Sequence, residues 1–588
     1  MQDKKLIPYG ISDFSEISQF NTYYVDKTHY IPEIEKTKYN FFIRPRRFGK
    51  SLFSSMLQAY YDVRYDNRFD VFFKNTWIHS NPTKERASYL VLYLDFSRIS
   101  KEINDPQIAF NKYCKHKIKE FSNRYKDYLT QEVIDEISKA DTCHDQFLIL
   151  ESALSESEHK LYIIIDEYDH YTNNLLARFG EEIYHQITHT DGFFKQFFTN
   201  LKGMTSGTDS MLKRLYITGV SPVTMDDVTS GFNIGANISL SPQFNSVMGF
   251  TEKEMSEIFD YFIDENVQVS RPYLLETMKK WYNNYLFSGY ATEQVFNTTG
   301  SWYYIHSILS INNVPSYLID DNLRMDYTKL KDLVYYGTKI NGNFDVLSEI
   351  ITNGGRAAKV SHSFPYNLIK RENNYVSLLY FFGFLTHSKE LYKGQPYLCI
   401  PNETIRHLVY DYFSTILEDA YGNINWLDKL SHLTSELAYD GEFKPIIEYI
   451  NKLLNMQTSI KDYNEGESVV KAHFNIYLGI NDFYQSYTEH EMNKGFADIV
   501  LFPFFHKYPT MKYAYLIEIK YIKKTIQKDK LEIEKEKKIK EAEEQLIKYS
   551  EDHKSRKICQ IEPYGHIILK KIIIVYHGWD LIYYEEIS

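Results

Sequence analysis

Residues 39–51 read Tyr-Asn-Phe-Phe-Ile-Arg-Pro-Arg-Arg-Phe-Gly-Lys-Ser. The apolar run at 39–43 predicts a buried strand, and the side chains at 52, 56, 57 and 60 recur at helical spacing. Strand, loop and helix in this order are the setting of the phosphate-binding loop G-x-x-x-x-G-K-[ST]. Gly49, Lys50 and Ser51 fit the second half of that pattern, whereas Arg44 stands in place of its first glycine.

The glycine-lysine-serine end of this loop predicts a nucleotide site. Backbone N–H groups of such a loop, and of the helix that follows it, bind phosphate oxygens. Lys50 would reach the β- and γ-phosphates, and the Ser51 hydroxyl would hold Mg²⁺. We therefore expect Gly49, Lys50 and Ser51 to bind ATP, with Ser51 also acting as a metal ligand.

Three further apolar runs follow the first strand, at 90–95, 161–165 and 214–219, and they alternate with helical stretches. This alternation predicts a parallel sheet with helices on both faces. Asp166 and Glu167 come directly after the third of the four strands. We expect Asp166 to complete the Mg²⁺ site and Glu167 to polarise the attacking water.

Four polar residues near the loop allow two interpretations each. Arg44, Arg46 and Arg47 add positive charge for a polyphosphate, or they form a salt-bridge cluster on the surface. Thr218, at the end of the fourth strand, is a polar group of the nucleotide site or a hydroxyl that caps the next turn. The predicted cofactor-binding set includes all four.

The chain of 588 residues is too long for one hydrophobic core. We divide it into a nucleotide-binding α/β domain over 1–250, a mainly helical domain over 251–425 and a second α/β domain over 426–588. Helical spacing of apolar residues at 297–312 and 377–385 supports the assignment of the middle domain.

The last domain combines helices with apolar strands. Residues 427–460 have a helical pattern, and a further helix begins near 465. Strands are expected at 497–504, 513–519 and 567–576, and a long charged helix is expected at 526–549. The fold class is therefore α/β at both ends with a helical middle region.

Acidic residues interrupt two of these strands. Asp498 lies inside an apolar strand, and Glu518 and Lys520 occupy positions i and i+2 of the next one, which face the same side. Charge in an apolar strand is costly unless it is paired or bound to a metal. We expect Asp498 and Glu518 to hold Mg²⁺ and Lys520 to position or activate water for phosphodiester hydrolysis. Glu467 is either a further metal ligand or a solvated acid at the start of a helix.

The composition limits the partners and the compartment. The formal charge of −11 gives no general sign of nucleic-acid binding, although residues 507–557 carry 15 Lys and Arg against 10 Asp and Glu. That stretch is an exposed helix with paired charges or a surface for a nucleic-acid backbone. Four scattered cysteines, no signal-like stretch and no apolar run of membrane-spanning length favour the cytoplasm.

These residues resemble a known family. The arginine-rich loop and the preceding Tyr24-Val25-Asp26-Lys27-Thr28 are similar to the AAA-ATPase-like proteins of bacteria, which usually carry a C-terminal PD-(D/E)xK nuclease-like domain. Matching segments are Asp166-Glu167-Tyr168-Asp169, Thr218-Gly219-Val220-Ser221, Gly249-Phe250-Thr251 and Trp281-Tyr282-Asn283-Asn284-Tyr285, where Asn284 replaces the family's glycine. Gln545 and Tyr549 look like the family's Gln-x-x-x-Tyr, which implies that Gln545 belongs to the nuclease active site.

The resemblance implies a P-loop ATPase domain, a helical region and a restriction-endonuclease-like α/β domain. The function that we expect is ATP binding and hydrolysis coupled to a Mg²⁺-dependent nuclease acting on nucleic acid, DNA in preference to RNA. The alternative is a nucleotide-gated switch or scaffold whose nuclease-like domain only binds nucleic acid or protein. No membrane partner is expected, and a homo-oligomer is left open because related ATPases often form rings.

Overall fold

The computed structural model describes most of the chain, as two compact units. It describes residues 4–155, 157–189, 192–207, 210–223, 225, 232–324, 342–421, 426–456, 466–480, 483–492, 495–504, 507–551 and 567–587. The first unit comprises Met1–Tyr336 and Lys359–Leu391, and the second comprises Gly337–Ala358 and Tyr392–Ser588. Both units draw on the middle region of the sequence, and the domain boundaries expected at 250 and 425 stay a prediction.

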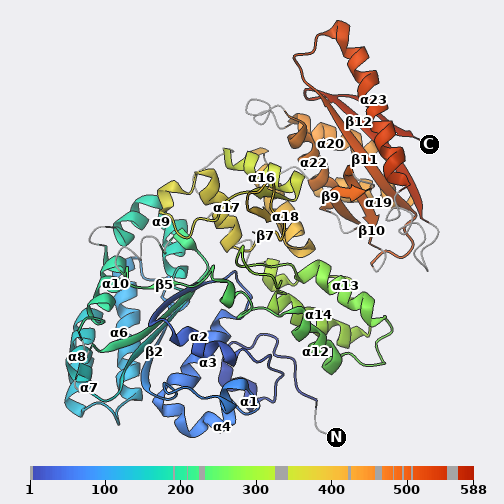
Figure 1. The fold of residues 1–588 in the computed structure, drawn as a ribbon. Helices are drawn as coiled ribbons and strands as arrows, with labels where there is room; N and C mark the ends of the chain where they lie inside the picture. The colour runs from blue at the N-terminus through green and yellow to red at the C-terminus, as the bar shows by residue number, and fades with distance from the viewer. Residues whose placement is uncertain are drawn as a thin grey trace. The chain divides into compact units, whose positions relative to one another are not determined.

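A five-stranded parallel sheet forms the centre of the first unit (Figure 1). Its strands are β1 (Tyr39–Ile43), β2 (Tyr89–Asp95), β3 (Lys160–Asp166), β4 (Leu212–Gly219) and β5 (Ala236–Asn237), in the spatial order β2-β3-β4-β1-β5. Every neighbouring pair runs parallel. The four predicted strands are confirmed, and the two-residue β5 was not predicted.

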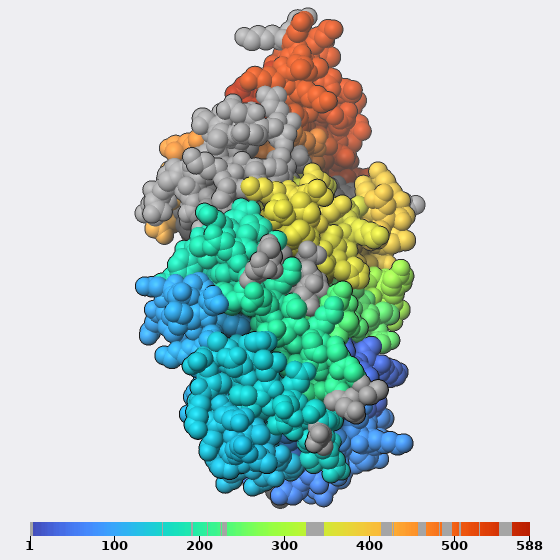
Figure 2. Space-filling model, turned by 90° about the vertical axis from the view of Figure 1, so that its left-hand side faces the viewer, coloured from blue at the N-terminus to red at the C-terminus, as the bar shows by residue number. Residues whose placement is uncertain are grey.

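Helices cover both faces of this sheet. The α-helices of the first unit for which both ends are described are α1 (Phe14–Gln19), α2 (Ile31–Glu35), α3 (Lys50–Tyr61), α4 (Phe69–Phe72), α5 (Trp77–Ser80), α6 (Pro106–Arg124), α7 (Gln131–Lys139), α8 (Cys143–Ser155), α9 (His170–Thr188), α10 (Phe193–Gly203), α12 (Glu252–Phe262), α13 (Arg271–Tyr282), α14 (Thr298–Ile311) and α17 (Glu372–Phe381). In Figure 1, α6, α7, α8 and α10 lie on one side of the sheet and α2 and α3 on the other. The first group forms much of the surface of this unit that faces the viewer in Figure 2. Strands covered on both sides need apolar residues at most positions, as β1 and β3 have.

The parallel direction of the strands places the predicted nucleotide residues together. All carboxyl ends of the parallel strands meet at one edge of the sheet, where ligands bind in open α/β folds. The loop after β1, Asp95 at the end of β2 and Asp166 at the end of β3 therefore share that edge.

The helical middle region is confirmed. The helix expected at 297–312 is α14, which begins after Asn297, whose side chain accepts a hydrogen bond from the backbone N–H of Gly300 (2.9 Å). The helix expected at 377–385 is α17, which begins earlier and ends at Phe381. Gly383 follows with a positive φ of 84°, a conformation that commonly ends helices.

A second sheet, of mixed direction, forms the centre of the second unit. Its strands are β9 (Tyr484–Met492), β10 (Gly495–Pro503), β11 (Tyr513–Ile522), β12 (Ile568–His577) and β13 (Asp580–Ile587), in the spatial order β13-β12-β11-β10-β9. The pair β11–β12 is parallel and the other pairs are antiparallel. The three predicted strands are confirmed as β10, β11 and β12, whereas the outer strands β9 and β13 were not predicted.

The described part of the second unit also contains helices and two short strands. They are α16 (Gly342–Asn353), α18 (Glu403–Tyr421), α19 (Trp426–Tyr439), α20 (Lys444–Met456), α22 (Glu467–Gly479), α23 (Lys528–Ser550), β6 (Gly355–Ala357) and β8 (Tyr397–Cys399). The helical region expected at 427–460 is two helices, α19 and α20, and its residues 457–460 lie outside the described residues. Gly441, with a φ of 77°, lies between those helices. The long helix α23 packs on the sheet through Ala542, Leu546 and Tyr549.

No helix among the described residues is both long enough and apolar enough to cross a membrane.

Candidate functional sites

The phosphate loop connects β1 to the N-terminus of α3. Gly49 precedes the helix with a φ of 94°, a conformation that strains any residue with a Cβ. Arg47 also has a positive φ, of 66°, so the loop bends sharply at two positions. The first N–H groups of a helix have no partner within the helix and attract anions. The local geometry therefore matches the strand, loop and helix that the sequence predicts.

Arg44 is buried behind the loop, with an exposed fraction of 1%. Its guanidinium group donates hydrogen bonds to the carbonyl oxygens of Ser239 (2.6 Å) and Phe244 (2.8 Å). It also lies 4.3 Å from the centroids of both the Phe42 and the Phe287 rings. Burial lowers the pKa of Arg44 to about 10. The sequence allowed Arg44 either a contact with a polyphosphate or a salt bridge on the surface. Neither fits, because Arg44 is buried and is not among the residues that line the cavity in front of the loop.

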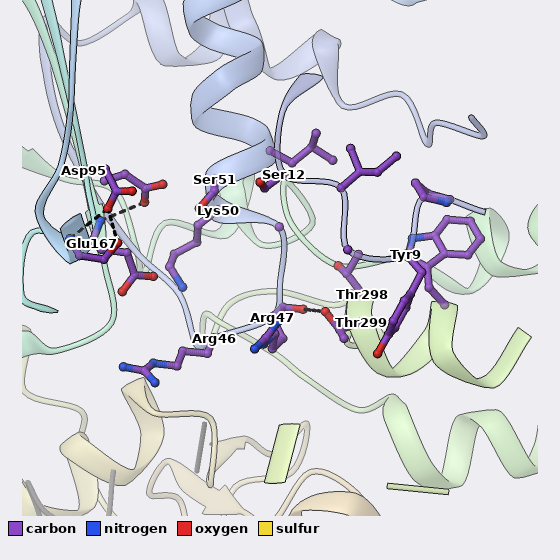
Figure 3. A pocket seen from close by; sticks show the side chains of 18 of the residues that line it. Tyr9, Ser12, Arg46, Arg47, Lys50, Ser51, Asp95, Glu167, Thr298 and Thr299 are labelled. Atoms are coloured by element: carbon purple, nitrogen blue, oxygen red, sulfur yellow. Dashed lines mark hydrogen bonds between the residues drawn. The ribbon is translucent and has the colours of Figure 1, made fainter. Parts of the chain in front are cut away.

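A cavity of about 400 Å³ lies in front of the loop (Figure 3). Its lining comes from the N-terminal segment, the loop with the start of α3, the ends of β2 and β3, and the start of α14. The lining residues are Pro8–Ser12, Arg46, Arg47, Gly49–Leu52, Asp95, Ser97, Asp166, Glu167, His170, Thr298, Thr299 and Trp302. Of the three predicted arginines, Arg46 and Arg47 thus face the cavity.

Lys50 is buried, and its ammonium group donates a hydrogen bond to the carbonyl oxygen of Pro45 (3.1 Å). Figure 3 shows its side chain directed into the space between Glu167 and Arg46. Burial lowers the pKa of Lys50, and the nearby carboxylates of Glu167 and Asp166 oppose that shift. A buried cation beside an open cavity is suited to bind an anion.

Asp166 and Ser51 contact each other at the floor of this cavity. The Ser51 hydroxyl donates a hydrogen bond to the Asp166 carboxylate, which also accepts one from the Tyr93 hydroxyl (3.0 Å). Burial, followed by the charge of Glu167, raises the pKa of Asp166 to about 6. Serine and aspartate oxygens are ligands that Mg²⁺ accepts. These residues therefore fit a magnesium ion held with the phosphates of a nucleotide.

Glu167 lies in the cavity because the backbone turns sharply after β3. Its φ is 52°, which is uncommon for a residue with a side chain. Its carboxylate lies 3.9 Å from the His170 ring nitrogen Nδ1, and burial lowers the pKa of His170. His170 and Asp95 line the cavity, although the sequence interpretation did not include them. The position of Asp95 at the end of a strand was the signal that could have identified it.

Two segments that carry the family resemblance contact each other directly. The Asp169 carboxylate accepts hydrogen bonds from the backbone N–H groups of Val220 (3.1 Å) and Ser221 (2.7 Å). A Cβ on Gly219 would come within 2.2 Å of Asp169 Oδ1, so this close approach requires glycine. Asp169 thereby connects the loop after β3 to the end of β4.

Thr218 points to the neighbouring strand instead of the cavity. It is fully buried, and its hydroxyl donates a hydrogen bond to the carbonyl oxygen of Phe42 in β1 (2.7 Å). Thr218 is not among the residues that line the cavity. Its position supports a link between β1 and β4, and it does not support the expected contact with a nucleotide or the capping of the next turn.

The second unit brings the predicted nuclease residues together. Asp498 on β10 accepts a hydrogen bond from the backbone N–H of Ile519 on β11 (2.8 Å). The Lys520 ammonium group donates to Glu518 Oε1 (2.7 Å) and to Gln545 Oε1 on α23 (2.5 Å). Gln545 therefore contacts the lysine, as the family resemblance implies.

Burial strongly affects the two carboxylates of this site. Glu518 is 2% exposed, and its Oε2 atom has no hydrogen-bond partner among the described residues. Burial, followed by the charge of Asp498, raises the pKa of Glu518 to about 7. Burial also raises the pKa of Asp498. A buried carboxylate oxygen without a partner is costly, and a cation bound beside Glu518 Oε2 would relieve that cost.

Lys471 on α22 is a member of this site that the sequence interpretation missed. Its ammonium group lies 2.6 Å from Asp498 Oδ1 and 2.6 Å from Glu467 Oε1. The Lys471 ammonium group therefore connects the carboxylates of Glu467 and Asp498. The Glu467 side chain is 47% exposed, against 9% for Asp498.

The residues of the second site fit a Mg²⁺ ion. Among the described residues, no three His, Cys, Asp or Glu side chains lie close enough together to hold a metal. Mg²⁺ does not need such a group, because it commonly keeps several waters and binds through one or two carboxylates. Asp498 and Glu518 can supply those carboxylates.

Two family models match the chain. Residues 8–229 match the model described as a predicted AAA-ATPase, and residues 465–586 match the model described as the PD-(D/E)XK nuclease superfamily. The resemblance inferred from the sequence is therefore confirmed: the chain has an AAA-ATPase-like region and a C-terminal PD-(D/E)XK nuclease-like domain. Such domains generally use a nucleotide, a divalent metal and a nucleic acid.

The chain is also similar to a curated protein of Azotobacter chroococcum mcd 1, described as an uncharacterized protein in the vnfD 5' region. The two are 25% identical over 302 residues, which cover 50% of this chain. The chain spans about half the length of that relative, with 51% of it covered. This similarity adds no activity to the family matches.

Proposed function

We propose that the protein binds and hydrolyses ATP in its first unit and cleaves nucleic-acid phosphodiesters in its second unit with the help of Mg²⁺. The observation that carries the nuclease proposal is the cluster of Asp498, Glu518, Lys520 and Gln545, in which one buried oxygen of Glu518 has no hydrogen-bond partner among the residues that the structure describes. The buried, unpaired oxygen is electrostatically unfavourable, and a bound cation would remove that penalty.

In the first unit, the start of α3, Lys50 and Arg46 bind the phosphates of ATP. Ser51 and Asp166 hold the magnesium ion that accompanies those phosphates. Glu167 orients and polarises the attacking water. Tyr9 and Trp302 line the same cavity and offer aromatic surface to the nucleoside.

In the second unit, Asp498 and Glu518 hold the metal and Lys520 positions the water. Gln545 fixes the direction of the Lys520 ammonium group through the 2.5 Å hydrogen bond. A bound Mg²⁺ supplies Lewis-acid polarisation of the phosphate. Burial of the two acids excludes bulk water and strengthens each of these interactions.

A cleavage assay on circular and linear DNA, single strands and RNA tests this proposal, with Mg²⁺ or with a chelator. We propose that DNA is the preferred substrate over RNA. We expect cleavage that requires Mg²⁺ and that falls at least about a hundredfold in Asp498→Asn and in Lys520→Met. Lys570→Met is the matched control, because Lys570 lies in the same sheet and pairs with Glu586 (2.9 Å) instead. Equal cleavage by Asp498→Asn and the wild type would contradict the assignment.

A second candidate function, a nucleotide-gated scaffold without cleavage, is favoured by one observation. The Lys471 ammonium group lies against Asp498, where a metal would bind. Nucleotide binding without ATP turnover or strand cleavage would support this candidate. A cytoplasmic location and assembly into homo-oligomers are part of the main proposal, and size-exclusion chromatography with and without ATP tests the assembly.

A further inference from the structure

The cations and carboxylates of the second site form a continuous chain. Glu467 contacts Lys471, Lys471 contacts Asp498, and Lys520 contacts Glu518. The Lys471 ammonium group therefore lies between two carboxylates, 2.6 Å from each, at the place where the sequence predicts a metal.

Three of the four carboxylate oxygens of Asp498 and Glu518 already accept a hydrogen bond. Asp498 Oδ2 accepts from the Ile519 backbone, Asp498 Oδ1 from Lys471, and Glu518 Oε1 from Lys520. Only Glu518 Oε2 has no donor among the described residues. A metal that bridges both acids would therefore share an oxygen of Asp498 with the group that now donates to it.

Lys471 is the donor of Asp498 that can leave. Ile519 donates from the backbone of a strand, so it cannot leave without disrupting the sheet. A divalent ion and the Lys471 ammonium group on the same Asp498 oxygen would repel each other. Lys471 has a second acceptor one helical turn away, because Glu467 and Lys471 are i and i+4 on α22.

We propose that Lys471 is the counter-cation of Asp498 in the metal-free site and that Glu467 retains it when a divalent metal binds. This inference rests on the proposed metal-dependent function of the second unit. Lys471 is thus a positioning residue that competes with the metal. Glu467 acts through Lys471 and is not itself a metal ligand, which differs from the role expected from the sequence.

A double-mutant cycle separates the two roles of Glu467. Calorimetric titration of full-length, nucleotide-free protein with MgCl₂ would compare the wild type, Lys471→Met, Glu467→Gln and the double variant. We expect Lys471→Met to tighten Mg²⁺ binding about tenfold and Glu467→Gln to weaken it about threefold, because coupled neighbours show interaction energies of this size. In the Lys471→Met background, Glu467→Gln should have no effect.

Several variants keep the titration interpretable. Asp498→Asn identifies the heat that belongs to the second site, and Lys570→Met tests the loss of a similarly exposed lysine that pairs with a different glutamate. Lys471→Arg retains the positive charge and should bind Mg²⁺ no more tightly than the wild type. Unfolding curves for each variant, with and without MgCl₂, verify that the protein is folded and report metal binding independently.

The outcomes distinguish the inference from the function on which it rests. Unchanged or weaker Mg²⁺ binding by folded Lys471→Met overturns the inference alone. Equal weakening by Glu467→Gln in both backgrounds also overturns it, because Glu467 would then be a metal ligand. If neither the wild type nor Lys471→Met gives heat that Asp498→Asn removes, both the metal-dependent function and the inference fail.

Discussion

Replacing Arg44 by glycine restores the general phosphate-loop pattern, yet we expect this change to damage the protein. Arg44 has no positive φ, so the backbone at this position does not require glycine. The side chain fills a buried space between two aromatic rings and holds carbonyl oxygens from a distant segment of the chain. We therefore expect Arg44→Gly to destabilise the first unit without improving nucleotide binding.

The loss of stability that we expect in Arg44→Gly follows from the contacts of the Arg44 side chain. It donates three charge-assisted hydrogen bonds, to Ile43, Ser239 and Phe244, worth about 1.5 kcal/mol each at the low end. The two ring contacts add about 1 kcal/mol each. Burial of the charge opposes these contributions by about 3 kcal/mol, because the pKa falls from 12.5 to about 10. The net loss is about 3–4 kcal/mol, a large part of the stability of a typical domain.

Differential scanning calorimetry measures this loss in the transition that moves to higher temperature when ATP is added. Arg46→Gly is the matched control, because it introduces the same glycine into the same loop at a residue that lines the cavity. We expect Arg46→Gly to weaken ATP binding with a smaller change in stability. An Arg44→Gly protein with unchanged unfolding, or with tighter ATP binding, would refute the structural role of Arg44.

Three further predictions concern buried charges. Lys50→Ala should weaken ATP binding about tenfold to a hundredfold in calorimetric titrations, because a charge-assisted contact to phosphate is lost; unchanged affinity would contradict this. Asp169→Asn should lower the free energy of unfolding by about 1–3 kcal/mol, since Val220 and Ser221 donate to separate oxygens of Asp169 and asparagine keeps only one of them; denaturant titration measures the change. Because the pKa of Glu518 is about 7, Mg²⁺ affinity should fall about tenfold per pH unit below that value and level off above it. In the metal-free protein the same raised pKa lowers the free energy of unfolding as pH increases from about 4.5 to about 7. If neither the Mg²⁺ affinity nor the free energy of unfolding changes with pH in this way, the raised pKa of Glu518 is excluded.

Strands rich in buried apolar residues were predictable, including β2 at the edge of the first sheet, whereas the outer strands of the second sheet were not. Strands such as β3 and β11 are covered on both faces, so β3 has a continuous apolar run at 161–165 and β11 is apolar around its Glu518 and Lys520. The outer strands β9 and β13 end the second sheet on each side and carry many polar residues. In β13 the apolar signal is missing because its residues are exposed or half-buried, so much of its surface remains in water.

The direction of a side chain limited the prediction of the nucleotide site. The sequence identified the positive charge of Arg44, Arg46 and Arg47, but neighbouring positions in a loop point in different directions. Only the fold shows that Arg44 is buried behind the loop while the other two line the cavity. Strand periodicity was more informative for Glu518 and Lys520, because alternate residues of a strand must share a face.

Lys471 was missed because its local pattern indicates an ordinary surface pair. A glutamate and a lysine at i and i+4 occur on many exposed helices, and the contact with Asp498 exists only after α22 packs on the sheet. That contact changes the charge of the site: two lysines balance two buried carboxylates before any metal binds. A divalent ion added with both lysines in place would leave an excess of positive charge in a buried site. The phosphate group of a nucleic acid lowers this excess, so the site should bind metal and substrate together more tightly than metal alone.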